Sequence, residues 1–228
     1  MTLRLLAPAG PVESGRLAIV RARYWAGPAS LSTSWEWDDG AVEHADLDTG
    51  DARTRRSHRY AGPGVYRVQV RVGPRDAEPG YVRYVTVRTG LQTAASGWIR
   101  DASSAAPVPF GFLITPASAD RDGVIVLRCA LGVDEMRASD LVWLFVAEPG
   151  SLHFGGTASV GPNDARHPFR VDVRSTASRA RHPTQQLTMS VYAAGAVPGH
   201  DSPLHRLSGP VRPGRVEFGP LAMAAPPL

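Results

Sequence analysis

The sequence predicts an all-β protein made of two β-sandwich modules in tandem. Its 228 residues exceed a single sandwich and suit two domains of ordinary size. The 23 glycines and 20 prolines, set against few aromatic residues, are typical of many short strands joined by tight turns. No stretch of helical length places apolar residues at the helical period, and residues 136–143 allow one short helical turn at most. We therefore expect strands throughout.

Composition divides the chain into five segments. Residues 1–10 form an N-terminal segment, and residues 11–88 form the first sandwich. Residues 89–97 are small and polar, which is typical of a linker. The second sandwich spans residues 98–219, and residues 220–228 are a tail rich in proline and alanine. The linker is thus expected to separate two independent cores.

Four strands are predicted in the first module. Residues 18–24 alternate in polarity, and a second strand at 34–37 ends in the turn at 38–40. A third strand covers 66–72, after a turn at 61–64 in which proline and glycine supply the required φ values. Its apolar residues alternate with arginine and glutamine, so one face should be buried and the other solvated. A fourth strand covers 81–88.

Six strands are predicted in the second module, at residues 124–131, 141–146, 154–160, 169–174, 187–191 and 215–218. Residues 141–146 are apolar on both faces, which predicts a central strand covered on both sides. Cys129 lies on the apolar face of its strand and should be a buried structural thiol. As the single cysteine, it forms neither an intrachain disulfide nor a cysteine-based metal site.

Two motifs in the first module point to a family. Trp35, Trp37, Asp39 and Gly40 match a W-x-F-G-D-G turn, and His58, Tyr60, Pro63, Gly64 and Tyr66 match H-x-Y-x-x-P-G-x-Y. Together these motifs resemble the PKD domain, an immunoglobulin-like β-sandwich. Asp38 stands where the family has its first glycine, so the turn geometry can differ there. The resemblance implies that Asp39 and His58 brace the turn and its loop.

The second half carries a weaker series of motifs in a recognisable order. Gly97-Trp98-Ile99 comes first, followed by Phe110-Gly111-Phe112, Trp143-Leu144-Phe145-Val146 and Phe154-x-Gly156. This order resembles the β-rich module that follows PKD domains in secreted bacterial proteins. The resemblance implies a jelly-roll-like or related sandwich. Neither resemblance implies enzymatic activity.

Charge and hydropathy favour some partners over others. The net charge is +4, the isoelectric point is about 9.7, and every basic residue is arginine. The arginines are not interleaved with an aromatic stacking platform, which disfavours nucleic acid as a partner. No run approaches the length of a membrane span, and no signal peptide is visible. Because PKD-like modules act mostly outside the cell, we expect an extracellular, cell-surface or virion location.

An acidic loop in the first module is a candidate calcium site. Hard cations take six to eight oxygen ligands, and closely spaced carboxylates can supply several. The candidate ligands are Asp38, Asp39, Asp46, Asp48 and Asp51. The alternative interpretation is a solvated loop whose charge is balanced by the arginines that follow it. Calcium is therefore one of two open interpretations.

Binding through aromatic and arginine side chains is a second candidate. Trp25 ends a strand and Trp98 follows the linker, so these two indoles are the ones expected to be exposed and able to stack on a glycan. Trp35, Trp37 and Trp143 are expected in the core. Arg67 and Arg71, with Arg83 on a nearby strand, could form a contact face for an acidic partner, and a solvated sheet face is the alternative.

No catalytic residues are predicted. Glu36 should face solvent, where a carboxylate with an ordinary pKa is a poor general acid. No G-x-S-x-G motif supports a serine triad. The sequence favours a non-catalytic structural or adhesive protein whose partners are other protein subunits in a surface or particle assembly. The alternatives are a phage virion component, such as a decoration or tail protein, and a glycan-binding accessory protein.

Overall fold

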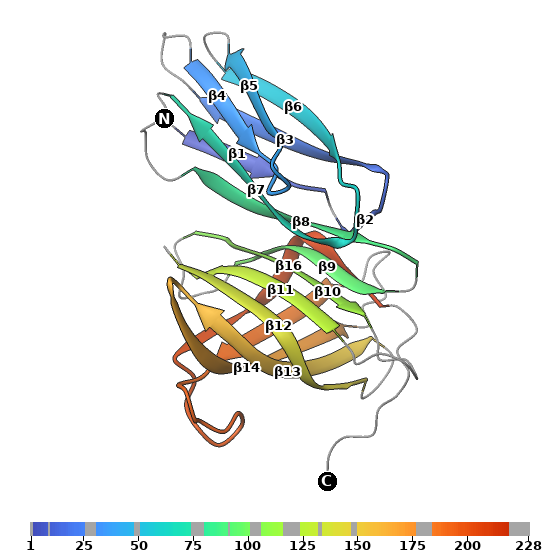
Figure 1. Ribbon diagram of the computed structural model, residues 1–228, viewed down its shortest axis with the longest axis vertical. Coiled ribbons are helices and arrows are strands. Elements are labelled where there is room, and N and C mark those ends of the chain that lie inside the picture. The colour runs from blue at the N-terminus through green and yellow to red at the C-terminus, as the bar shows by residue number, and fades with distance from the viewer. Residues whose placement is uncertain are drawn as a thin grey trace.

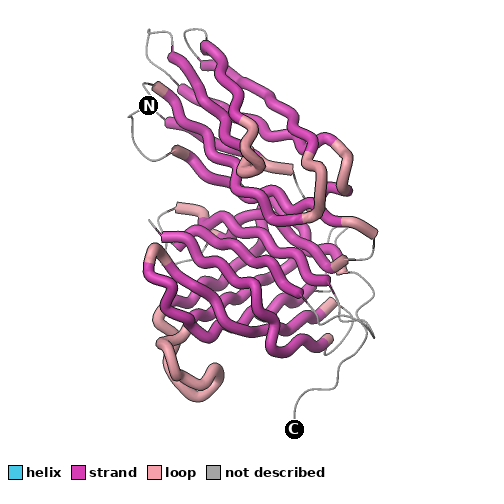
Figure 2. The backbone as a smooth tube through the Cα atoms, in the orientation of Figure 1, coloured by secondary structure: helices cyan, strands magenta, loops and turns pink. Residues whose placement is uncertain are grey.

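The computed structural model describes residues 2–8, 10–25, 31–47, 51–73, 80–90, 92–100, 106–115, 124–131, 134–146, 150–176 and 184–218. Strands and loops account for all of these residues (Figure 2), so the all-β prediction is confirmed. Among them there is accordingly no helix with the length and apolar character needed to cross a membrane.

The first part of the chain, residues 2–88, forms two packed sheets that we term the sandwich (Figure 1). One sheet has the order β1-β3-β6, with bounds Thr2–Leu6, Leu17–Trp25 and Asp51–Arg59. The other has the order β2-β8-β7-β4-β5, with bounds Val12–Glu13, Tyr81–Arg88, Gly64–Val72, Leu31–Glu36 and Val42–Leu47. All pairs are antiparallel except the short parallel pair of β2 with β8.

The core of the sandwich lies between these sheets. Alternate residues of β3 and β7 point into it, including Val20 and Val68, and Trp35 and Trp37 are fully buried there. Burying such side chains contributes about 1.5–3 kcal/mol for each aliphatic group. The alternation predicted for residues 66–72 is therefore present. Its opposite face is less solvated than expected, because Val65 and Gln69 are also buried, at 5% exposure each.

The second part of the chain, residues 93–217, closes into an eight-stranded barrel in the order β10-β11-β12-β13-β14-β15-β16-β9. The bounds are β9 Thr93–Ile99, β10 Val108–Thr115, β11 Val124–Leu131, β12 Asp134–Phe145, β13 Ser151–Val160, β14 Asn163–Thr176, β15 Thr184–Val191 and β16 His205–Glu217. Every neighbouring pair is antiparallel.

The barrel replaces the second sandwich that the sequence predicted. The last strand returns to the first, with Val211 opposite Ile99 and Val216 opposite Ala95. Inward side chains such as Phe112 and Phe154 fill the interior, as expected of a barrel of this strand number. Cys129 is fully buried among them, which confirms the structural thiol. A sandwich and a small barrel share the same period-2 pattern, so alternation alone could not separate them.

Three predicted segments differ in the structure. The expected linker 89–97 is largely β9, whose small residues are buried because the barrel interior lies on one side and the sandwich on the other. Residues 136–143 lie within β12, which leaves no place for a helical turn. Residues 141–146 are the outer end of that strand, where β-bulges turn the chain and leave Val142 71% exposed. Trp143 is half-buried for the same reason, outside the barrel core.

At the N-terminus, the segment 1–10 contributes β1 to the sandwich. The tail at 220–228 lies outside the described residues.

Sandwich and barrel pack directly on each other. A third apolar cluster, of Val65, Tyr84, Ala94 and Leu113, joins strands β7 and β8 of the sandwich to β9 and β10 of the barrel. Figure 1 shows these strands side by side where the two parts meet. This contact explains why the second face of β7 is covered, and it creates a junction between sandwich and barrel.

Candidate functional site at the junction of sandwich and barrel

The turn at residues 38–40 is braced by two residues that lie apart in sequence. Asp39 accepts a hydrogen bond from the Ala41 amide at 3.2 Å, and its Oδ2 lies 2.6 Å from Nε2 of His58. Burial raises the pKa of Asp39, but the hydrogen bonds from His58 and Ala41 outweigh burial and hold this pKa below its usual value. Asp39 and His58 therefore have the bracing positions that the resemblance implied.

Aromatic rings extend this brace into a continuous stack. The His58 ring lies on Trp37 with centroids 4.9 Å apart and meets Tyr60 edge-on at 4.7 Å. Tyr60 in turn stacks on Tyr66 at 3.9 Å. Gly64 packs closely beside the stack, and a Cβ at that position would lie 3.2 Å from the Tyr66 ring, tighter than an ordinary van der Waals contact. The motif residues thus form one packed unit of the sandwich.

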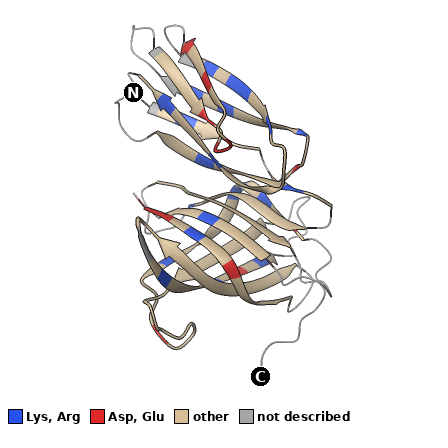
Figure 3. Cartoon of the chain, viewed as in Figure 1, with Lys and Arg blue, Asp and Glu red and all other residues tan. Residues whose placement is uncertain are grey.

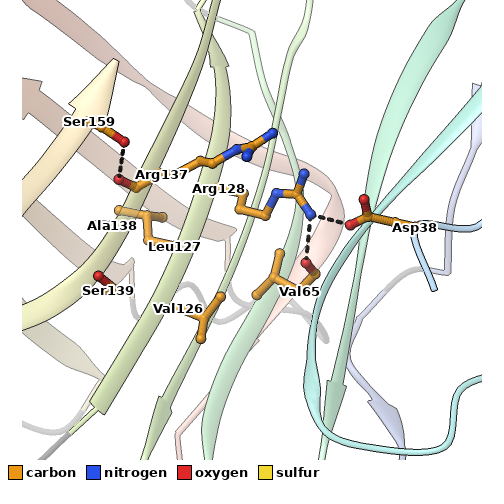
Figure 4. A pocket seen from close by; sticks show the side chains of 9 residues that line it. All are labelled: Asp38, Val65, Val126, Leu127, Arg128, Arg137, Ala138, Ser139 and Ser159. Carbon is orange, nitrogen blue, oxygen red and sulfur yellow. Dashed lines mark hydrogen bonds and ion pairs between the residues drawn. The ribbon is translucent and has the colours of Figure 1, made fainter. Parts of the chain in front are cut away.

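Asp38 points away from this unit and reaches the barrel (Figure 4). Its φ is 67°, in the left-handed region that glycine adopts readily and aspartate tolerates better than most residues. Its carboxylate accepts hydrogen bonds from the Arg67 amide, at 3.0 Å, and from the Arg128 guanidinium. Asp38 therefore keeps the backbone conformation typical of glycine and adds a charge that contacts the barrel.

Arg128, on β11, is the centre of the junction. Its guanidinium contacts Asp38, donates to the Val65 carbonyl at 3.2 Å, and pairs with Glu135 through two hydrogen bonds of 2.8 and 3.2 Å. It also lies over the Tyr84 ring, 5.6 Å from the centroid. With its side chain only 12% exposed, Arg128 joins groups of both parts in a largely desolvated setting, where charge-assisted hydrogen bonds are strongest.

Glu135, on β12, accepts hydrogen bonds from three side chains at once. The Tyr84 hydroxyl donates to it at 2.7 Å, and Arg137 donates at 2.7 Å from the solvent side. Burial would raise the pKa of Glu135, but the hydrogen bonds from Arg128, Tyr84 and Arg137 outweigh burial and lower it. Glu135 is therefore held as a carboxylate between sandwich and barrel.

Further contacts extend the junction on both sides of this cluster. Thr86 donates to the Ala95 carbonyl at 2.5 Å, and Arg88 pairs with Glu217 at 3.0 Å. Gly111 permits the close approach of the strands, because a Cβ there would lie 2.7 Å from Val65 and 2.9 Å from Thr86. These polar and steric constraints fix the barrel against the sandwich.

A groove of about 860 Å³ lies beside the junction, between β1 and β8 of the sandwich and the barrel wall. It contains the indole of Trp98, together with Arg4, Arg67, Arg83 and Arg100. Arginine is spread over strands of both parts (Figure 3), and the groove is a place where arginines from both parts meet. The structure thus brings Trp98, a candidate for stacking on a glycan, together with Arg67 and Arg83, candidates for contact with an acidic partner.

The other predicted binding residues lie elsewhere. Arg71 pairs with Glu36 at 3.4 Å, on the sheet surface rather than in the groove. The side chain of Trp25 lies outside the described residues.

The predicted calcium ligands do not converge in the described part of the chain. Asp38 and Asp39 serve different partners, Arg128 and His58, and Asp46 is exposed on β5. Asp48 and the side chain of Asp51 lie outside the described residues. Within the described ranges, no group of three or more His, Cys, Asp or Glu side chains could hold a metal ion.

A serine, a histidine and an aspartate lie in a chain of hydrogen bonds on the outside of the barrel. Ser151 Oγ is 2.9 Å from Nε2 of His153, whose Nδ1 is 2.5 Å from Asp172. This is the connectivity of a hydrolase triad, but Ser151 is only 4% exposed, His153 is 6% exposed, and Phe145 stacks on the imidazole at 4.8 Å. A nucleophile must be reached by its substrate. We interpret the cluster as a cross-strand polar network, further tied down by the hydrogen bonds from Arg170 to Asp172.

Sequence reasoning missed Arg128 and Glu135. The one local indication was that each is a charged residue in a strand whose neighbours alternate toward a core. Their partners in the sandwich, Asp38 and Tyr84, are far away in the sequence.

Compared with models of known protein families, with curated proteins and with solved structures, the chain matches none. The resemblance to the PKD domain therefore stays a prediction, and the function is inferred from the chain's own geometry.

Proposed function

We propose that this protein is a non-catalytic structural and adhesive component, in which sandwich and barrel act as one rigid unit that contacts other protein subunits at a surface or within a particle. The observation that carries the proposal is the junction. Arg128 contacts Asp38, Val65 and Tyr84 of the sandwich as well as Glu135 of the barrel. A unit of fixed shape suits an assembly, because a subunit that binds the sandwich then also fixes the position of the barrel.

The PKD-like identity of the first part belongs to this proposal. It is supported by the stack that runs from Trp37 through His58 and Tyr60 to Tyr66, and by the brace between Asp39 and His58.

Open sheet edges also support an interaction role. Among the described strands, β1, β2, β5 and β6 are the edges of the sandwich sheets and pair on one side only, whereas the barrel is closed and has no free edge. Free edges offer unpaired backbone groups to a second chain. Subunit contacts are therefore expected to involve the sandwich more than the barrel.

Sedimentation velocity over a concentration series tests the proposal. We expect the purified chain to associate with itself in a concentration-dependent way. A chain that stays monomeric at the highest concentration, with no partner bound, would contradict the assembly role, and turnover in a hydrolase panel would contradict the non-catalytic role.

A further inference from the structure

The groove beside the junction has the chemistry of a ligand site. Its volume of about 860 Å³ falls within the range of roughly 300–1,000 Å³ that small-molecule sites occupy. Trp98 projects outward from β9 and is half-buried, so part of its ring remains accessible. Pro107 and Pro109 add apolar surface next to it. An aromatic face bordered by apolar residues suits a flat, partly apolar ring.

The arginines of the groove are not neutralised within the described part of the chain. Arg83 donates to two backbone carbonyls, those of Leu5 at 3.2 Å and Val82 at 2.8 Å, and it forms no ion pair with a described residue. Burial and the neighbouring charge of Arg4 lower the pKa of Arg83 to about 10. The side chains of Arg67 and Arg100 have no carboxylate partner among the described residues either. Positive charge is thus concentrated in the groove, and these arginines form no ion pair with a carboxylate among the described residues.

The two acidic residues of the groove differ in whether they can bind a ligand. Glu135 is committed to Arg128, Tyr84 and Arg137, as described above. Asp134 is exposed at the rim and can accept hydrogen bonds from hydroxyl groups. A ligand that fits must therefore combine a negative charge for the arginines, hydroxyl donors for Asp134, and a ring for Trp98.

We propose that this groove binds a short saccharide that carries carboxylate groups, such as an oligomer of a uronic acid. The carboxylates would pair with Arg4 and Arg100, because guanidinium groups bind carboxylates through two parallel hydrogen bonds. A sugar ring would stack on Trp98, and its hydroxyls would donate to Asp134. A polyacidic peptide fits less well, since it has neither a sugar ring to stack on Trp98 nor sugar hydroxyls to donate to Asp134. This inference does not depend on the proposed assembly role.

Titration calorimetry at low salt with a short oligomer of galacturonic acid tests the site. We expect binding by the intact chain, and binding about tenfold weaker for the Arg100→Gln variant, because one charged hydrogen-bonding pair is removed. Arg4→Gln should have a similar effect. The matched control is Arg55→Gln, which removes one exposed arginine from β6, away from the groove. All three variants have the same net charge, so a general charge effect would weaken them equally.

Two comparison ligands sharpen the result. A neutral galactose oligomer of the same length should bind at least tenfold more weakly than the acidic one, and a short polyglutamate peptide should bind more weakly as well. The proposal is overturned if the acidic saccharide does not bind, if Arg55→Gln weakens binding as much as Arg100→Gln, or if polyglutamate binds as tightly as the saccharide. Circular dichroism of each variant confirms that the fold is retained.

Discussion

Replacing Arg128 with methionine should strongly destabilise the protein, because its guanidinium joins the two parts of the chain. Methionine keeps most of the side-chain volume and removes the charge. The variant leaves Glu135 with Tyr84 and Arg137 as donors, and it deprives Asp38 and the Val65 carbonyl of their common partner. The perturbation therefore acts on polar contacts rather than on packing.

The magnitude follows from the burial of the groups involved. Breaking one side of a fully buried ion pair costs about 3–5 kcal/mol. Arg128 is 12% exposed and Glu135 is 16% exposed, while Asp38 is 33% exposed, so solvent recovers part of this cost. We expect a loss of about 2–3 kcal/mol, discounted from that range. For a chain of this size such a loss lowers Tm by roughly 4–12 °C.

The assay is differential scanning calorimetry of Arg128→Met beside Arg137→Met. Arg137 contacts the same carboxylate, but its side chain is 65% exposed, so its removal should cost less than about 1 kcal/mol. The penalty for Arg128→Met should also shrink at acid pH, because Arg128 helps to lower the pKa of Glu135 and this stabilisation is lost as the pH falls through the folded pKa. Equal losses of stability in the two variants would refute the reasoning.

Three further outcomes follow from the same contacts, each measured by chemical denaturation. Asp38→Ala should be less stable than Asp38→Gly by about 1 kcal/mol, since glycine accepts the left-handed φ without strain; a more stable alanine variant would contradict this. Gly111→Ala should cost about 1–3 kcal/mol by separating the packed strands, whereas Gly62→Ala, with open space around it, should be close to neutral. Because the pKa of Asp39 is lowered in the fold, its contribution is present above the unfolded value and is lost as pH falls through the folded value. Asp39→Asn should therefore reduce the acid sensitivity of stability, and an unchanged pH profile would argue against the brace.

The sandwich was largely predictable because its signals are local. The alternation around Val68 and Val70 sets which residues of β7 are buried, and the spacing from Trp35 to Tyr66 places the braced turn. These patterns depend on strand geometry and turn chemistry over short distances. They could not show that the outer face of β7 is covered, since the covering residue Gly111 belongs to another part of the chain.

The barrel and its junction depend on contacts that are distant in sequence. Residues 93–97 contain only small side chains, which is a pattern typical of a linker. They form a buried strand because β9 pairs with β16, which lies far away in the sequence. Arg128 and Asp38 each look like a surface charge when considered alone, and they meet because β11 packs against the turn that begins at residue 38. Trp98, Arg67 and Arg83 of the groove are candidate binding residues from their sequence positions, but no local pattern places them together.

The closure of the barrel through β9 has a consequence for the order of folding. During synthesis the strands of the sandwich are complete once β8 has emerged, so its core can form early. The two neighbours of β9 appear at very different times, because β10 follows directly and β16 comes at the far end of the barrel sequence. Until β16 has been synthesised, one edge of β9 has backbone N–H and C=O groups without a partner strand. Ala94 packs on the sandwich, so we expect one face of β9 to be covered before β16 has been made, and we expect the first part of the chain to support folding of the second.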